Sequence, residues 1–129
     1  MQKVDIYIYT SSKAPQVSTG KYRYKLTCSG HELEGQGQQE TTTAHRLAMV
    51  CAIEALKRMN RPALITIHTA CRYMINGHGM LGQWRENAWH KRAGKPLKNA
   101  DLWQELYEQT KQHAIKWEYC PNLLAQDKE

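Results

Sequence analysis

The stretch that organises this sequence is Gln83–Trp103, which reads QWRENAWHKRAGKPLKNADLW. It holds three of the four tryptophans of the chain, interleaved with lysines and arginines and with few acidic residues. Cations fix the register of a protein on a phosphate backbone, and aromatic rings offer apolar surface to sugars and bases. The stretch is therefore a nucleic-acid grip, or a helical segment whose tryptophans belong to the core and whose lysines form a solvated face. Composition alone does not separate these two interpretations.

The length and charge of the chain bound its class. A chain of 129 residues is expected to be one domain, with a core that needs no metal or disulfide. Its formal charge of +6 and its pI of about 9.2 favour a polyanionic partner, either nucleic acid or an acidic protein. Without a signal-peptide pattern or a long apolar run, we expect a cytoplasmic protein with no membrane partner. We expect reduced, mostly buried thiols at Cys28, Cys51, Cys71 and Cys120, which form no C-x-x-C pair.

Hydrophobic periodicity predicts a mixture of strands and helices. Alternating apolar residues, or a β-branched run, predict strands over residues 3–10, 22–28, 31–38, 63–68 and 115–119. Helical periodicity predicts helices over residues 44–59, 70–77, 80–89 and 100–112. The first helix is apolar on nearly every side, so it must be buried against a sheet. We expect Thr41–Thr43 and Asn99 to cap helices, and Gly77 to end one.

The order of these elements predicts the architecture. Three consecutive strands can pair as an antiparallel meander, whereas the two later strands must return by crossovers and pair in parallel. The predicted fold is therefore α/β, a mixed five-stranded sheet with helices packed on it. The third strand is polar and is expected at a sheet edge. We expect a single domain over residues 1–120, followed by a polar tail over residues 121–129.

Several motifs fit this order of elements. They are Tyr9-Thr10 at the end of the first strand, Ala52–Lys57 (AIEALK), Thr69-x3-Tyr73, Trp84-x4-Trp89, Lys95–Trp103 (KPLKNADLW) and Ile115–Glu118 (IKWE). Together they make the chain resemble ribonuclease H of the bacterial type I kind, over about residues 3–119. The resemblance implies a ribonuclease H-like fold.

The same resemblance assigns a role to the stretch quoted first. In the family, a basic protrusion grips the DNA strand of an RNA/DNA hybrid. The residues expected to contact nucleic acid are Trp84, Arg85, Trp89, Lys91, Arg92, Lys95 and Lys98. We therefore expect a nucleic-acid partner, with an RNA/DNA hybrid or another duplex as the first candidate.

The resemblance does not extend to the metal ligands. The family hydrolyses RNA with two divalent ions held by acidic residues, and the matching positions here are Ser11, His45 and Ala70. The fourth acidic residue lies on a C-terminal helix for which this sequence has no counterpart. Magnesium-type ions need carboxylate oxygens. We therefore expect a domain without catalytic residues, metal or cofactor; magnesium or manganese would be needed only by an active enzyme.

Other interpretations stay open from the sequence. His45 and His68, with Cys71 nearby, could form a zinc site, or could be a half-exposed first-turn residue and a hydrogen-bonded strand-end residue. The chain could also be a hybrid-specific endoribonuclease with non-standard ligands, or a protein-interaction domain with its tryptophans in the core. Without the C-terminal helix, Tyr7 and Tyr9 would belong to a bare apolar sheet face, which predicts a homodimer or a partner protein there.

Overall fold

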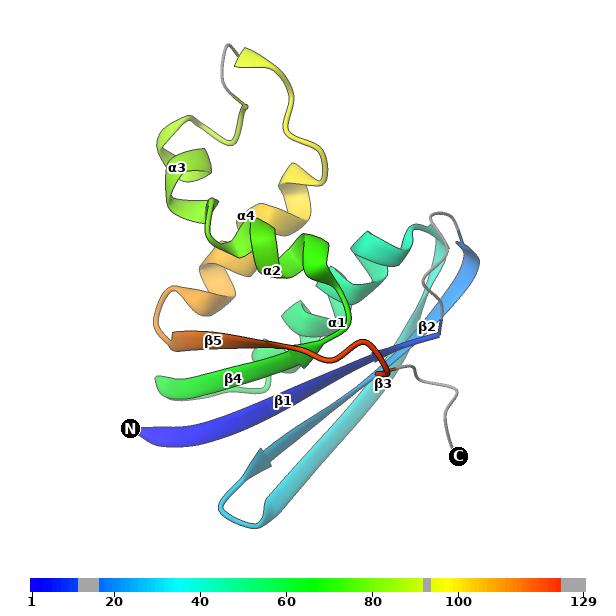
Figure 1. Ribbon diagram of the computed structural model, residues 1–129, viewed down its shortest axis with the longest axis vertical. Coiled ribbons are helices and arrows are strands. Elements are labelled where there is room, and N and C mark those ends of the chain that lie inside the picture. The colour runs from blue at the N-terminus through cyan, green and yellow to red at the C-terminus, as the bar shows by residue number, and fades with distance from the viewer. Residues whose placement is uncertain (12–16, 92–93, 124–129) are drawn as a thin grey trace.

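A five-stranded sheet carries all the described helices on one side (Figure 1). The structure is a computed structural model that describes residues 1–11, 17–91 and 94–123. The strands are β1 (Gln2–Thr10), β2 (Val17–Cys28), β3 (His31–Thr42), β4 (Ala63–Thr69) and β5 (Ala114–Tyr119). The helices are α1 (Ala44–Leu56), α2 (Arg72–His78), α3 (Leu81–Glu86) and α4 (Ala100–Thr110). Within the described ranges, no helix combines the length and the apolar character that crossing a membrane requires.

The order of strands across the sheet is β3-β2-β1-β4-β5. β2 pairs antiparallel with both β1 and β3, whereas β4 pairs parallel with both β1 and β5. The predicted combination of a three-strand meander with two parallel strands is therefore confirmed. The polar strand β3 lies at a sheet edge, as predicted.

The hydrophobic core lies between the sheet and α1. Val4, Ile6 and Ile8 point from β1 into this core and are buried, while the residues between them face the opposite side of the sheet. α1 has eight buried residues, which confirms the burial predicted from its apolar surface. Its start is also confirmed, since the Thr43 hydroxyl accepts a hydrogen bond of 3.1 Å from the backbone N–H of Arg46.

Some boundaries differ from the predicted ones. β2 and β3 are longer, because residues 17–21 pair with residues 38–42 beyond the predicted strand ends. Gly77 does not end α2 but lies inside it, where a Cβ atom would collide with the ring of Trp103. Asn99 stands at the N-cap position of α4 with φ of 60°, but its side chain makes no capping hydrogen bond. Gly77 and Asn99 therefore take part in contacts between helices, with Trp103 of α4 and Tyr73 of α2 respectively.

The cysteines are less buried than predicted. Cys51, in the middle of α1, is buried, whereas Cys28, Cys71 and Cys120 are half-exposed. These three lie at or next to the ends of β2, α2 and β5, where a side chain has fewer neighbours than in the core. The predicted C-terminal tail begins after β5, and its residues 124–129 lie outside the described residues.

Candidate nucleic-acid interface and the cavity beside it

A basic arm, residues 87–98, joins α3 to α4 and projects from the end of the molecule (Figure 1). Asn87 shapes its base, because its side-chain amide donates hydrogen bonds of 2.9 Å to the carbonyl oxygens of His90 and Lys91. The backbone N–H of Lys91 donates to the carbonyl oxygen of Lys95 at 2.8 Å, which brings the two sides of the arm together. Arg92, one of the predicted contact residues, lies outside the described residues.

The tryptophans anchor the arm to α4. Trp103 is buried in the core, and the ring of Trp84 packs on it with 5.2 Å between ring centroids. Trp89 packs edge-on against Tyr107, with centroids 5.9 Å apart. Trp84 and Trp89 are half-buried, so part of each ring stays exposed. These rings therefore pack against the core and keep part of their surface exposed, an arrangement that is compatible with both sequence interpretations.

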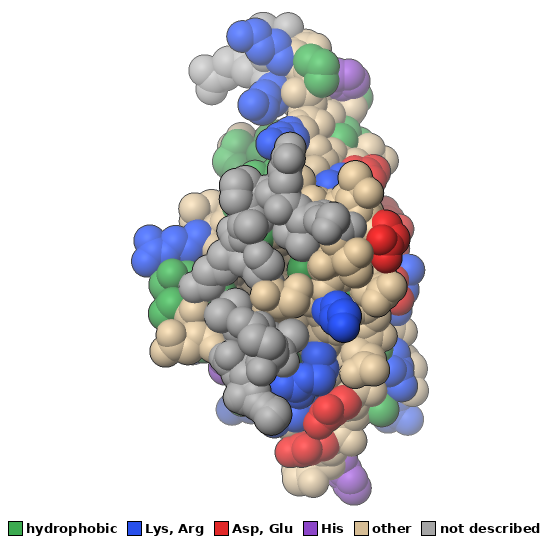
Figure 2. Space-filling view, turned by 90° about the vertical axis from the view of Figure 1, so that its right-hand side faces the viewer, with side chains coloured by type: hydrophobic (Ala, Val, Ile, Leu, Met, Phe, Trp, Pro, Cys, Tyr) green, Lys and Arg blue, Asp and Glu red, His purple; other side chains and the backbone are tan. Residues whose placement is uncertain are grey.

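The lysines of the arm are free to contact a polyanion. Lys91, Lys95 and Lys98 are exposed, and within the described residues none of them forms a salt bridge. Arg85 is exposed as well, with its guanidinium carbon 5.5 Å from the centroid of the Tyr107 ring. Figure 2 shows basic side chains at the upper end of the molecule, where the arm lies. The predicted contact residues that are described thus share one end of the protein.

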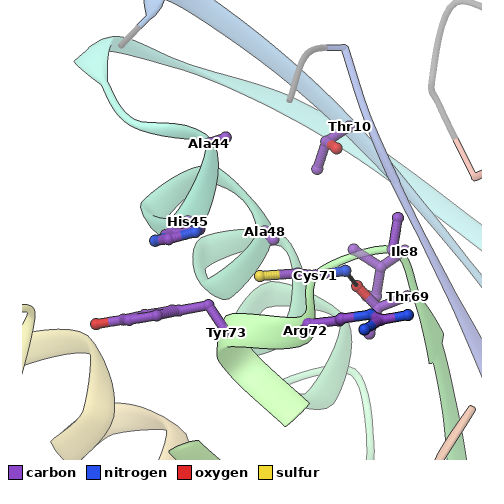
Figure 3. Close-up of a pocket in the computed structure, with 10 residues that line it drawn as sticks. Ile8, Thr10, Ala44, His45, Ala48, Thr69, Cys71, Arg72 and Tyr73 are labelled. Carbon is purple, nitrogen blue, oxygen red and sulfur yellow. Dashed lines mark hydrogen bonds between the residues drawn. The ribbon is translucent and has the colours of Figure 1, made fainter. Parts of the chain in front are cut away.

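A cavity of about 180 Å³ lies beside the carboxyl ends of the parallel neighbours β1 and β4 (Figure 3). The residues that line it are Ile8, Thr10, Ala44, His45, Ala48, Thr69, Ala70, Cys71, Arg72 and Tyr73. In open α/β sheets, the crevice outside the carboxyl ends of strands is the usual place for a ligand. The positions predicted to replace acidic residues are here: His45 and Ala70 line the cavity, and Ser11 follows Thr10. The Ser11 hydroxyl accepts from the backbone N–H of Lys21 at 3.0 Å.

The polar groups of the cavity are neutral or cationic. The Thr69 hydroxyl accepts a hydrogen bond of 3.1 Å from the backbone N–H of Cys71. The imidazole of His45 stacks on the ring of Tyr73 with 4.1 Å between centroids. Burial, together with the nearby charge of Lys98, lowers the pKa of His45, so its ring stays neutral at pH 7. Burial raises the pKa of the Cys71 thiol, which therefore stays protonated.

This set of side chains does not fit a magnesium ion. No carboxylate is among the lining residues, and Arg72 carries a positive charge on the cavity wall, with its guanidinium carbon 4.3 Å from the Tyr119 ring centroid. Across the described part of the chain, no cluster of three or more histidine, cysteine or acidic side chains could hold a metal ion. Divalent ions of this class need several anionic oxygens.

The two histidines considered as zinc ligands lie on different faces of the sheet. His45 is at the cavity, whereas His68 points to the face without helices. There, its Nε2 atom is 2.8 Å from Oδ1 of Asp5, and its ring stacks on Tyr7 with centroids 4.3 Å apart. The zinc interpretation is therefore wrong, and His68 is a hydrogen-bonded strand-end residue. Its pairing with Asp5 was missed by sequence reasoning.

The open sheet face is less apolar than predicted. Tyr7 and Tyr9 are half-buried, and basic side chains from β2 cover them. The guanidinium carbon of Arg23 lies 4.1 Å from the centroid of the Tyr9 ring, and Nζ of Lys25 lies 5.4 Å from that of Tyr7. In such cation–π contacts, the positive charge is attracted to the face of the aromatic ring, so these faces are not bare apolar surface. The prediction of an exposed apolar patch is wrong, because Arg23 and Lys25 lie over the two rings. The sequence alone does not show where these two cations lie.

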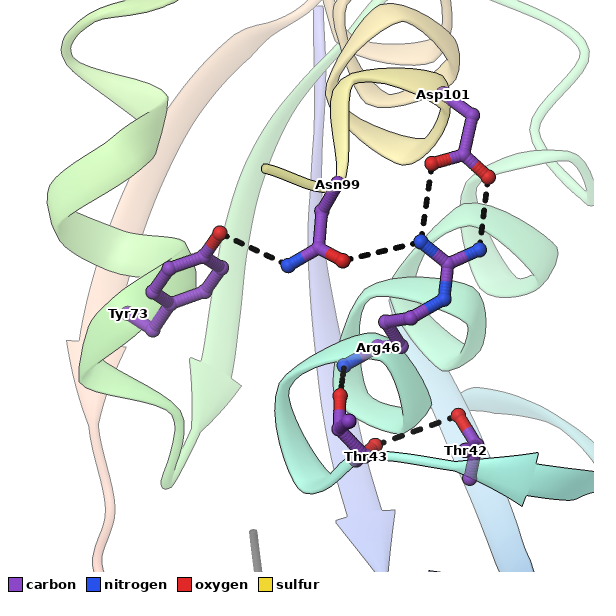
Figure 4. A network of polar contacts seen from close by, with 6 residues as sticks. All are labelled: Thr42, Thr43, Arg46, Tyr73, Asn99 and Asp101. Carbon is purple, nitrogen blue, oxygen red and sulfur yellow. Dashed lines mark hydrogen bonds and ion pairs between the residues drawn. The ribbon is translucent and has the colours of Figure 1, made fainter. Parts of the chain in front are cut away.

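A polar network that was not predicted holds the segment where the arm joins α4 (Figure 4). Arg46 on α1 forms a bidentate pair with Asp101 on α4, at 3.0 and 2.7 Å. The same guanidinium donates to the side-chain oxygen of Asn99 at 3.1 Å, and the Asn99 amide donates to the hydroxyl of Tyr73 at 2.9 Å. The network therefore joins α1, α2 and α4 between the arm and the cavity.

The sequence is similar to that of known proteins along almost its whole length. A family model described as RNase H matches residues 1–122. A protein named Ribonuclease H from Cupriavidus metallidurans is 36% identical over 124 residues, which cover 92% of this chain and 82% of the relative. Another Ribonuclease H, from Thiobacillus denitrificans, is 34% identical over 116 residues, which cover 88% of this chain and 78% of the relative.

The fold is also found in solved structures. The crystal structure of LC9-RNase H1, a type 1 RNase H with the type 2 active-site motif, matches with a TM-score of 0.75 and 20% identity. That match covers 95% of this chain and 64% of the other, so this chain spans less than two thirds of that protein. The crystal structure of LC11-RNase H1 in complex with RNA/DNA hybrid matches with a TM-score of 0.66 and 11% identity, over 92% of this chain and 86% of that one. At these identities the matches establish a shared fold.

Proposed function

Because this chain belongs to the ribonuclease H family, we propose that it is a single ribonuclease H-like domain, over residues 1–120, that binds nucleic acid without hydrolysing it. The basic arm makes the contact together with Trp84 and Arg85 of α3, and an RNA/DNA hybrid or another duplex is the ligand. The fold neighbour LC11-RNase H1 was solved with an RNA/DNA hybrid, and this supports the choice of ligand.

The observation that carries the proposal is the chemistry of the cavity beside β1 and β4. Its polar wall consists of threonine hydroxyls, the His45 imidazole, the Cys71 thiol, the Tyr73 phenol and the Arg72 guanidinium. Two divalent ions bring four positive charges, which such a wall does not compensate. A phosphodiester can approach Arg72, but none of the described residues that line the cavity has a carboxylate to hold a metal that would activate water. We therefore attribute the proposed lack of hydrolysis to the side chains at this site.

The arm supports the binding part of the proposal. Its exposed lysines are not neutralised by acidic neighbours in the described chain, and the half-buried rings of Trp89 and of Trp84 in α3 offer flat apolar surface next to them. Lysines on a phosphate backbone release counterions, and aromatic rings pack on sugars and bases. The proposed contact residues are Trp84, Arg85, Trp89, Lys91, Arg92, Lys95 and Lys98, of which Arg92 lies outside the described residues.

The test of binding is the affinity for a labelled RNA/DNA hybrid as a function of salt. The logarithm of the affinity should fall with the logarithm of the salt concentration, with a slope of roughly −0.7 to −0.9 per phosphate neutralised. Changing Lys91, Lys95 and Lys98 to Gln should weaken binding and make the slope shallower by about one for each lost contact. Undetectable binding to hybrid, duplex and single strands at low salt would contradict the proposal.

The chain offers a matched control for the arm variant. Lys3, Lys21 and Lys116 are also exposed, and they lie on the open face of the sheet, away from the arm. Changing these three to Gln lowers the net charge by the same amount. If the arm makes the contact, this control should keep most of the affinity. An equal loss in both triple variants would mean that net charge, and not the arm, drives binding.

The alternative of an active endoribonuclease has its own test. Labelled hybrid is incubated in turn with magnesium, manganese and zinc, and the RNA is sized on a denaturing gel. Cleavage that survives repurification and disappears in His45→Ala would establish an enzyme with unusual ligands. A protein-interaction domain is the remaining alternative, and a protein that binds no nucleic acid under any of these conditions would favour it.

Self-association and location complete the proposal. A homodimer through the open sheet face stays a prediction. The cations over Tyr7 and Tyr9 count against it, because they make this face more polar than a permanent interface usually is. A dimer mass by light scattering at micromolar concentration would support it, and a monomer mass would contradict it.

We propose the cytoplasm as the location, because all four cysteines are free thiols, as is usual in a reducing compartment.

A further inference from the structure

Three reactive side chains form a line on the open sheet face, opposite to the helices. Nε2 of His68, on β4, lies 2.8 Å from Oδ1 of Asp5 on β1. On the other side of the same ring, Nδ1 lies 4.0 Å from Sγ of Cys120, which directly follows β5. The order carboxylate, imidazole, thiol is that of a nucleophile with a general base and a residue that orients the base.

The contact with Asp5 decides which ring nitrogen faces the thiol as an acceptor. A carboxylate only accepts hydrogen bonds, so the nitrogen next to it, Nε2, must carry the proton. In the neutral ring, Nδ1 then has a free lone pair, and this lone pair faces Cys120. The stacking of the imidazole on Tyr7, with rings 11° from parallel, holds it in this orientation. The imidazole is therefore set to take a proton from the thiol.

The surroundings keep the thiol within reach of a reagent. The side chain of His68 is 16% exposed, that of Asp5 is 45% exposed, and Cys120 is half-exposed. The charged or titratable groups around the imidazole are Asp5 and Tyr7 from β1, Glu118 from β5 and Cys120 directly after β5, with Lys25 of β2 over the Tyr7 ring. Asp5 and Cys120 lie at opposite ring nitrogens, so the three groups form a relay for a proton and do not surround a metal.

We propose that Cys120 is a reactive thiol that exchanges with small-molecule disulfides, with His68 as its general base and Asp5 as the residue that positions the base. As Sγ of Cys120 forms a bond to one sulfur of the disulfide, its proton passes to Nδ1 of His68. The S–S bond of the reagent breaks, and its second sulfur leaves as a thiolate that takes up a proton. The protein gains a mixed disulfide, and the reagent, which is the oxidant, is reduced to one thiol.

A contact of 4.0 Å between thiol and base suits this role. Nucleophile–base contacts are often loose before a substrate binds, and they shorten during reaction. The backbone N–H of Cys120 donates a hydrogen bond of 2.8 Å to the carbonyl oxygen of Thr69, which fixes the chain beside His68. The nucleophile and its base are therefore both held by the sheet.

The other three cysteines provide internal references. Cys28 is half-exposed like Cys120, but its thiol contacts the hydroxyl of Ser29 at 4.0 Å, which is not a base. Cys51 is fully buried, and burial raises the pKa of its thiol, as it does for Cys71. Each cysteine lies in a different tryptic peptide, so the four rates can be measured in one sample.

The experiment is a time course with glutathione disulfide on the folded full chain, analysed by mass spectrometry of tryptic peptides. At pH 7, Cys120 should react about tenfold faster than Cys28, since a neighbouring base raises the reactivity of a thiol by such factors or more. His68→Gln should bring the rate of Cys120 down to about that of Cys28. In that variant, the rate should depend more steeply on pH, because hydroxide and not a neighbouring imidazole must take the proton from the thiol.

Asp5→Asn tests the positioning role. The asparagine amide can donate to Nε2, which would put the ring proton on Nδ1, where it faces the thiol and blocks proton uptake. Cys120 should then slow and follow the pH dependence seen in His68→Gln, while Cys28 keeps its rate. Cys51 must stay unlabelled, which shows that each variant is folded. Equal rates at Cys120 and Cys28 in the wild type, or an unchanged Cys120 rate in folded His68→Gln, would overturn the proposal.

Discussion

Among the described residues that line the cavity beside β1 and β4, Arg72 carries the one permanent charge. Its neighbour His45 is a titratable group, but burial and Lys98 lower its pKa, so it adds no charge at pH 7. Because none of these described lining residues has a carboxylate, Arg72 makes the cavity attract anions and repel divalent cations. Ser11, His45 and Ala70 stand where the family has acidic residues. Their lack of negative charge therefore affects the sign of the electrostatic potential at the cavity as well as the number of metal ligands.

The first prediction follows from this difference in charge. Changing Ser11 and Ala70 to Asp and His45 to Glu should create a binding site for divalent cations, because it brings three carboxylates to one end of β1 and β4. Manganese should then broaden the NMR signals of Thr10 and Thr69. The matched control carries Asn, Asn and Gln at the same three positions and should show no such broadening. Equal broadening in the wild type would contradict the prediction.

At the scale of elements, the packing of α2 on α4 depends on a missing side chain. A Cβ atom at Gly77 would collide with the ring of Trp103, so only glycine lets the two helices come this close. Gly77→Ala should lower the free energy of unfolding by about 1–3 kcal/mol, the usual cost of overpacking. Urea denaturation measures this change.

Gly82 provides the control for that substitution. It lies in α3, and a Cβ atom there would meet nothing within 4 Å. Gly82→Ala should leave the stability unchanged or raise it by up to about 1 kcal/mol, since alanine is the better helix former. If both substitutions had the same effect, the contact with Trp103 would not be the reason for Gly77.

The link between α1 and α4 should make stability depend on pH. The hydrogen bonds from Arg46 lower the pKa of Asp101 below its value in the unfolded chain, which is about 3.9. Its contribution is therefore complete above that value and is lost as the pH falls through the lower, folded pKa. Because Asp101 is 66% exposed, Asp101→Asn should cost only about 0.5–1 kcal/mol at pH 7.

Urea denaturation of wild type and Asp101→Asn at pH 7 and at pH 3 tests this prediction. The difference between the two proteins should shrink at the lower pH. Glu108→Gln, which removes an exposed pair with Lys111, should cost less than Asp101→Asn at pH 7. A constant difference between wild type and Asp101→Asn over the whole range would mean that the carboxylate does not stabilise the fold.

At the scale of the whole molecule, local pattern predicts the elements and the sheet well. The alternation of Val4, Ile6 and Ile8 correctly predicts the buried face of β1, and the all-round apolar surface of α1 predicts its burial. The polar sequence of β3 predicts a sheet edge. These features depend on residues two to four positions apart, which is the distance that periodicity reports.

Contacts across crossovers could not be predicted in this way. Gly77 is a helix terminator by its local pattern, and only Trp103, from another helix, gives it a different role. Arg46 and Asp101 are 55 residues apart, and their pairing requires the relative position of α1 and α4. The cations over Tyr7 and Tyr9 likewise come from the neighbouring strand β2.

The candidate site shows the same division. The composition of the arm and the positions that lack acids are visible in the sequence. The partial burial of Trp84 and Trp89, the charge of Arg72 on the cavity wall and the relay from Asp5 to Cys120 depend on the tertiary structure. The sequence thus shows which chemical groups are present, whereas it does not show which neighbouring residues change their exposure, charge or reactivity.

The most direct test of the central claim is one titration of an RNA/DNA hybrid with 5′-labelled RNA, measured in EDTA and again in magnesium, with the RNA sized afterwards. We expect the two dissociation constants to agree within about twofold and the RNA to stay intact, because the proposed binding surface is the arm and no described residue of the cavity offers a carboxylate to a metal. RNA that is shortened only in magnesium, by the repurified protein, would contradict the account.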